Sequence, residues 1–216
     1  MWCADFAEDR ILERFGDLLM SVPFSSAKPG FTYLMIRAVD STETPVFEQD
    51  LRAVPLDAAA IIQLSGEHLH SDCSYEVQSH WDLWGFDIGA GKFQLQPHAL
   101  EILCRGEDYD GGSWREDGHL QVNFGFEHAF TGHAGLLGIH HGPQSPAESL
   151  EEAHFLEAMA WPETLERYQE KTRDNISRVF DWVRQIEKAL PVSRFRLWSE
   201  GEENLEARME EILAAR

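Results

Sequence analysis

Strict alternation between apolar and polar residues constrains the fold of this chain more than any other feature. In residues 74–86 (SYEVQSHWDLWGF) and 119–127 (HLQVNFGFE), the large apolar side chains fall on one parity and the polar ones on the other. Each pattern predicts a strand with one buried face and one face toward solvent. In the second segment, His119 and Glu127 are expected to share the outward face.

Other short apolar segments predict further strands. Residues 31–39 (FTYLMIRAV) are apolar on both faces, which is typical of a central strand. Residues 46–54 predict a hairpin partner, and residues 93–95 and 100–105 predict two strands separated by Pro97. A short alternating segment at 194–198 is expected to rejoin the edge of the same sheet.

Apolar residues at three-four spacing predict helices near both ends of the chain. Asp5 and Glu8 are expected to cap a helix over 5–21, and residues 55–65 predict a short second helix. The sequence SPAE at 145–148 predicts a cap for a helix ending near Ala160. The longest pattern, Leu165 to Leu190, predicts a helix that kinks near Asp174 and Asn175, and a last helix follows 199–202.

Together these patterns predict an α+β fold. We expect an antiparallel sheet of about five to seven strands with helices packed on one face and a long helix in the C-terminal third. Residues 31–127 are rich in predicted strands and residues 145–216 in predicted helices. Because the segment at 194–198 is expected to join the sheet, residues 1–216 are predicted to form a single α+β domain.

The charge of the chain limits its partners. The 38 acidic and 18 basic residues give a formal net charge of -20. Such a charge repels nucleic-acid phosphates and anionic lipids, so neither nucleic acid nor a membrane is an expected partner. A basic protein surface or a cation suits it better. A well-solvated acidic surface without a particular partner is the simplest alternative.

The cysteines and the N-terminal segment bear on the compartment. Cys3, Cys73 and Cys104 lie far apart in the sequence and form no CxxC pair, which disfavours a zinc knuckle or a disulfide framework. The first fifteen residues lack the basic and apolar regions of a secretory signal, and no apolar run approaches the roughly 20 residues that span a bilayer. We therefore expect a cytoplasmic protein with reduced thiols.

The histidine-rich segment that follows the second alternating strand is a candidate metal site. Imidazole and carboxylate groups are the usual ligands of zinc, iron and manganese. The spacing matches no HExxH or zinc-finger motif, so a loop in which histidine is merely tolerated is the alternative. The candidate ligands for one divalent transition metal are Glu127, His128, His133, His140 and His141.

The acidic turn EDYDGGSWRED at 107–117 is a candidate protein-binding loop. An aromatic residue with a charged rim is the composition of an interface hot spot, although Trp114 could equally fold back on the core. A calcium-binding EF-hand is excluded, because the twelfth position counted from Asp108 is His119. The candidate binding residues are Asp108, Asp110, Trp114, Glu116 and Asp117.

These features support two hypotheses of different kinds. Phosphate-loop, GxSxG and GxGxxG motifs are absent from the sequence, and its catalytic residues are therefore unknown. The first hypothesis is a non-catalytic binding domain that engages a basic protein partner, of the neutralising or adaptor type. The second is a metal-dependent enzyme, a hydrolase, that uses the segment 119–141 with His119 or Asp110 as general base. The substrate and the oligomeric state are not indicated.

Overall fold

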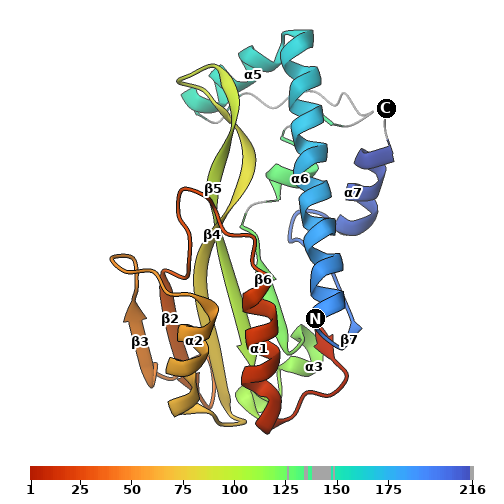
Figure 1. Cartoon of the computed structure of the whole chain (residues 1–216). Coiled ribbons are helices and arrows are strands. Elements are labelled where there is room, and N and C mark those ends of the chain that lie inside the picture. The colour runs from red at the N-terminus through yellow and green to blue at the C-terminus, as the bar shows by residue number, and fades with distance from the viewer. Residues whose placement is uncertain (126, 134–135, 138–146, 148, 215–216) are drawn as a thin grey trace. The chain divides into compact units, whose positions relative to one another are not determined.

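The computed structural model of the protein describes residues 1–125, 127–133, 136–137, 147 and 149–214 (Figure 1). The fold is α+β, as the sequence predicts. Among the described residues, five strands form an antiparallel sheet in the order β3-β2-β4-β5-β6, and a separate two-stranded sheet joins β1 to β7. The long helix predicted in the C-terminal third is α6, Pro162–Ala189.

The remaining elements of regular structure are as follows. The strands are β1 (Trp2–Cys3), β2 (Tyr33–Ala38), β3 (Phe47–Asp50), β4 (Cys73–Asp87), β5 (Lys92–Arg105), β6 (Leu120–Asn123) and β7 (Val192–Arg194). The helices are α1 (Ile11–Met20), α2 (Ala58–Ser65), α3 (Trp114–Asp117), α4 (His128–Thr131), α5 (Leu150–Met159) and α7 (Leu205–Ala214), with short 3-10 turns η1 (Glu8–Arg10), η2 (Gly66–His68) and η3 (Tyr109–Gly111).

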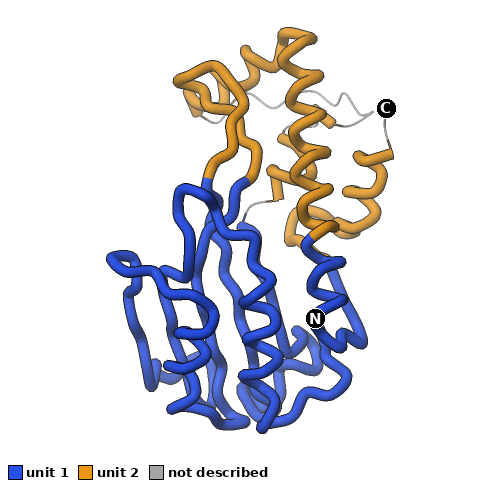
Figure 2. Tube along the Cα trace, in the orientation of Figure 1, with its two compact units in different colours: residues 1–82, 97–125, 182–196 blue, residues 83–96, 126–181, 197–216 orange. Residues whose placement is uncertain are grey.

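The described chain divides into two compact units, coloured separately in Figure 2. Unit 1 comprises residues 1–82, 97–125 and 182–196, and unit 2 comprises residues 83–96, 126–181 and 197–216. Both units are assembled from three separate stretches of sequence, because the boundary passes through β4, β5 and α6. That the whole chain behaves as a single domain stays a prediction.

The register of the sheet in unit 1 separates a buried face from a solvent-facing one. Leu34 pairs with Val77 and Ile36 pairs with Tyr75, and all four side chains are fully buried. Their neighbours along β2 and β4 therefore point to the opposite face, because successive side chains of a strand alternate. This confirms the parity of residues 74–86 as the sequence predicts it.

Helices α1 and α2 pack on the buried face of the sheet. Ile11, Phe15, Leu18 and Leu19 of α1 have no solvent exposure, and the ring of Phe15 lies 6.0 Å from that of Tyr75. The last turns of α6, which belong to unit 1, reach the same face, where Trp182 lies 5.7 Å from Trp81. Helices thus pack on one face of the sheet, as predicted.

Two N-terminal caps differ from the sequence analysis. Asp5 does not cap a helix; its carboxylate accepts a hydrogen bond from Arg14 at 2.8 Å and also pairs with Arg10, and the first helix starts at η1. The predicted cap at 145–148 lies largely outside the described residues. Instead Ser149 caps α5 by accepting the Glu152 backbone N–H at 3.0 Å.

Two strands also differ. β5 continues through Pro97. Its neighbour β6 pairs only with residues 101–104 of β5, so the N–H that proline lacks would have no partner on the β6 side, and the ladder loses no hydrogen bond there. β7 does not join the main sheet; it pairs with β1, where Trp2 lies opposite Arg194. β1 has only two residues at the start of the chain, too few to show an alternating pattern.

Unit 2 has an aromatic core of its own. Phe155 of α5 lies 5.5 Å from Tyr168 of α6 and 6.1 Å from Phe86 of β4, and Phe93 of β5 lies 5.0 Å from Phe86. The amide of Asn175 on α6 bonds the backbone of Trp84. Helices α4 and α7 also contact each other in this unit.

None of the described helices is both long enough and apolar enough to cross a bilayer.

Candidate functional site

The solvent-facing side of the sheet in unit 1 is the strongest candidate site. We call it the open face. Its side chains are exposed or half-buried except Ser74, which lies opposite Arg37 and is 5% exposed. The strands of this face carry four carboxylates and two guanidinium groups, and Arg52, just beyond β3, adds a third guanidinium group at its edge. By strand register its members are Tyr33, Met35, Arg37, Glu48, Asp50, Glu76, Gln78, Glu101, Leu103, Arg105, Gln121 and Asn123.

The two arginines of the open face are held by acceptors within the chain. Arg37 donates a hydrogen bond to the backbone oxygen of Glu43 at 2.6 Å. Arg105 donates to the side-chain oxygen of Gln121 at 2.9 Å, and burial lowers its pKa. These acceptors are uncharged, so both guanidinium groups keep their positive charges, and the four carboxylates outnumber the arginines of the face.

The pKa of Glu101 shows that a second carboxylate lies close to it on the open face. Its pKa is raised, first because β5 partly buries the group and second because the carboxylate of Glu76 lies near it. Both causes disfavour the charged form. A cation placed beside Glu76 and Glu101 would favour that form, so this part of the open face is electrostatically suited to a basic group.

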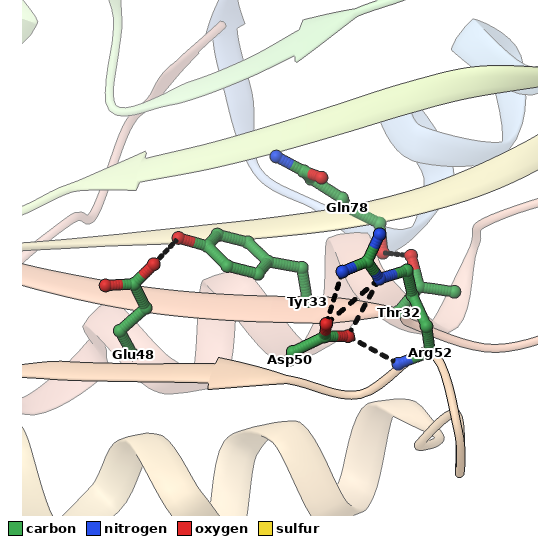
Figure 3. A pocket seen from close by; sticks show the side chains of 6 residues that line it. All are labelled: Thr32, Tyr33, Glu48, Asp50, Arg52 and Gln78. Carbon is green, nitrogen blue, oxygen red and sulfur yellow. Dashed lines mark hydrogen bonds and ion pairs between the residues drawn. The ribbon is translucent and has the colours of Figure 1, made fainter.

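The open face is hollowed where β3, β2 and β4 run side by side (Figure 3). The hollow has a volume of about 510 Å³. Tyr33 donates its hydroxyl hydrogen to Glu48 at 2.7 Å, and burial together with this bond raises its pKa to about 12. The residues that line the hollow are Thr32, Tyr33, Glu48, Asp50, Arg52 and Gln78.

A guanidinium group already occupies one side of this hollow. Nε of Arg52 lies 3.0 Å from each carboxylate oxygen of Asp50, and its Nη2 lies 2.5 Å from Oδ2. Hydrogen bonding to Arg52 lowers the pKa of Asp50 to about 2. The pair is exposed, at 80% for the Arg52 side chain and 53% for Asp50, so water competes for both groups.

The acidic loop predicted to bind a partner lies at one end of the sheet in unit 1. The carboxylates of Asp108, Asp110, Glu116 and Asp117 are all exposed. Asp108 accepts a hydrogen bond from the Ser71 hydroxyl at 2.7 Å, which ties the loop to the start of β4. The loop is thus ordered and acidic, and its binding role stays a prediction.

Trp114 is not an exposed anchor in this loop. Its ring is half-buried and stacks on His119, with centroids 4.3 Å apart and planes inclined by 18°. Its Nε1 donates to the backbone oxygen of Glu107 at 3.0 Å. The alternative in which Trp114 folds back on the protein is therefore the one that the structure shows.

The prediction that His119 faces outward is wrong. Only 4% of the residue is exposed, because Phe6 stacks on the ring from the other side at 4.1 Å. Burial and the nearby positive amine of Met1 lower the pKa of His119 to about 4, and Nδ1 accepts the Cys3 N–H at 3.1 Å. A buried, neutral imidazole of this kind is unsuited to act as a general base toward a substrate.

The histidine-rich segment is only partly described. His140 and His141 lie outside the described residues. His128 and His133 face each other in unit 2 with ring centroids 5.4 Å apart, and His133 Nε2 lies 2.8 Å from a carboxylate oxygen of Glu152. Glu127 precedes α4 and lies against Gly201 instead.

A metal site is not formed by these groups as far as the structure describes them. Across 1–125, 127–133, 136–137, 147 and 149–214, there is no group of three or more His, Cys, Asp or Glu side chains arranged to hold a metal ion. The metal-dependent hydrolase therefore stays a hypothesis.

Sequence reasoning missed the hollow. The alternation of 74–86 already placed Glu76 and Gln78 on the outward face. The same parity in 46–54 places Glu48 and Asp50 together, but only the pairing of β3 with β2 brings them beside Tyr33. A strand's outward residues can be read from its pattern, whereas its neighbour in the sheet cannot.

Comparison with protein-family models, with curated proteins and with solved structures finds no match for this chain.

Proposed function

We propose that this protein is a non-catalytic binding domain that engages a basic protein partner through the open face. The observation that carries the proposal is the presence of four exposed or half-buried carboxylates, Glu48, Asp50, Glu76 and Glu101, on one face of the sheet. The raised pKa of Glu101 adds to it, because burial and the nearby Glu76 disfavour the charged carboxylate and a partner's cation would favour it.

The chemistry of the face selects the occupant. A second copy of this chain would bring another acidic face, and with a formal charge of -20 on each molecule the two would repel. A basic surface is attracted instead, and the attraction weakens with ionic strength because salt screens charges beyond about 10 Å at 0.1 M. The partner is therefore a basic protein whose association is fast and sensitive to salt.

The test uses poly-L-lysine of defined length as the basic probe, with affinity measured by biolayer interferometry at several salt concentrations. The open-face variant carries Glu48→Gln, Asp50→Asn, Glu76→Gln and Glu101→Gln. A matched control changes four exposed acids elsewhere in unit 1, namely Glu8→Gln, Asp9→Asn, Glu43→Gln and Glu67→Gln. Both variants change the net charge by the same amount.

We expect the open-face variant to weaken binding by about tenfold or more at low salt, and the control to weaken it much less. Equal losses in the two variants would mean that net charge alone attracts the probe, and the open face would not be the binding site. Wild-type protein that does not bind the probe at low salt would overturn the proposal altogether.

A further inference from the structure

The hollow of the open face holds a positive group supplied by the chain itself. Arg52 lies two residues beyond the end of β3, and its backbone N–H and side chain both bond Asp50, the last residue of that strand. The arrangement is local, and it fills only one side of a space of about 510 Å³. Tyr33, Glu48 and Gln78 line the rest (Figure 3).

The lining suits the chemistry of a guanidinium group. Carboxylates accept its N–H groups in a bidentate fork, as Arg52 already shows on Asp50. Glu48 supplies a second carboxylate on the same face of β3, two residues away, and Tyr33 supplies an aromatic ring between the two. Aromatic rings and paired carboxylates favour arginine over lysine, whose compact ammonium is more strongly hydrated.

We infer that this hollow is a seat for an arginine side chain of the partner, and that Arg52 occupies it in the unbound protein. This inference rests on the proposed function. Arg52 must release Asp50 for the partner's guanidinium to bind in its place. The release is easy because the pair is exposed and water already competes for it.

The position of Arg52 in the hollow predicts how substitutions change the affinity for an arginine side chain. Removing its side chain frees Asp50 and should tighten arginine binding, whereas removing another arginine of the open face changes the charge equally without vacating the hollow. Arg37, whose guanidinium bonds the Glu43 backbone outside the hollow, is that matched control. Comparing Arg52→Gln with Arg37→Gln therefore separates release of the seat from a change of charge.

The experiment measures the binding of two blocked peptides by titration calorimetry at low salt. One peptide has arginines at alternate positions among glycines, and the other has lysines at the same positions. For the wild-type protein we expect tighter binding of the arginine peptide. Asp50→Asn should weaken that peptide by about tenfold, the loss of one charge-assisted hydrogen-bonded pair, while Arg52→Gln tightens it several-fold and Arg37→Gln by less.

Two results would overturn the seat while leaving the proposed function intact. One is equal affinity of the arginine and lysine peptides in every variant, with the open-face quadruple variant still defective toward poly-L-lysine. The other is an Asp50→Asn variant that binds the arginine peptide as well as wild type does. If the wild-type protein binds neither peptide nor poly-L-lysine, the proposed function fails together with the seat.

Discussion

The side-chain amide of Asn175 and the backbone of Trp84 exchange two hydrogen bonds. Oδ1 of Asn175 accepts the Trp84 N–H at 2.8 Å, and Nδ2 donates to the Trp84 oxygen at 3.0 Å and to the Ala129 oxygen at 3.1 Å. Asn175 is 2% exposed. One side chain of α6 thus satisfies backbone groups of β4 and α4 within unit 2.

Replacing Asn175 with leucine should destabilise the protein by about 2–4 kcal/mol. The substitution keeps the branched shape of the side chain but leaves the part-buried N–H and C=O of Trp84 without this partner. Urea denaturation followed by circular dichroism measures the change. The neighbouring substitution Asp174→Ala is the control; it removes a surface ion pair with Lys171 and should cost less than about 1 kcal/mol. Equal losses in the two variants would contradict this role for Asn175.

Replacing Val39 with glycine should stabilise the protein by about 1 kcal/mol. Val39 has φ of 72°, a left-handed conformation that strains a β-branched residue, and its side chain is 55% exposed, so little apolar burial is lost. Its backbone oxygen accepts the Asp110 N–H at 2.7 Å, and its N–H donates to the Asp72 oxygen at 2.9 Å; these bonds hold the strained geometry.

The matched control for Val39 is Val46. It is 52% exposed and has no positive φ, so Val46→Gly should destabilise the protein by several tenths of a kcal/mol or more. Thermal unfolding of both variants checks the sign. If Val39→Gly lowers the melting temperature as Val46→Gly does, the left-handed conformation carries no strain.

The protein should lose stability as the pH falls from about 6.5 toward 4, in part because of His119. The pKa of His119 is about 4 when folded, against about 6.5 when unfolded, so the unfolded state binds the extra proton in this window. Stability from this group is complete above pH 6.5. It declines by up to about 1.4 kcal/mol per pH unit as the pH drops through the window.

The variant His119→Phe isolates this effect. Phenylalanine can keep the stack between Phe6 and Trp114 but cannot titrate. Because the Cys3 N–H loses its acceptor, we expect about 1–2 kcal/mol lower stability at pH 7.5. The slope of stability against pH between 6.5 and 4.5 should become shallower by up to one proton. An unchanged slope would assign the acid sensitivity to other groups.

The three cysteines should be unreactive in the folded protein. All are buried, and burial raises the pKa of Cys3 and of Cys73 to about 11 and that of Cys104 well above its usual range. Thiolates are the reactive species, so iodoacetamide at pH 8 should modify none of the three until denaturant is added. Mass spectrometry of the alkylated protein counts the modified sites. Rapid labelling of native protein at Cys73 would show that the end of β4 opens readily.

Local patterns predicted most of the elements correctly. The apolar parity of 74–86 and the three-four spacing of 165–190 both correspond to β4 and α6 as the structure shows them. The predicted kink at Asp174 and Asn175 rested on competition for local backbone bonds, but Asn175 bonds Trp84 and Ala129 instead, and α6 continues through it. The sequence cannot show a partner 91 residues away.

What the sequence alone determined is the α+β class, the long helix, the acidic charge and the outward parity of Glu76 and Gln78. These depend on periodicity and composition, which are local properties of the chain. The tertiary structure decided that His119 is buried between Phe6 and Trp114, that β7 pairs with β1, and that Asp50 and Glu48 lie beside Tyr33 in one hollow. Alternation gives the face of a strand but not its neighbour, because pairing between distant strands is set by how all the buried faces pack together.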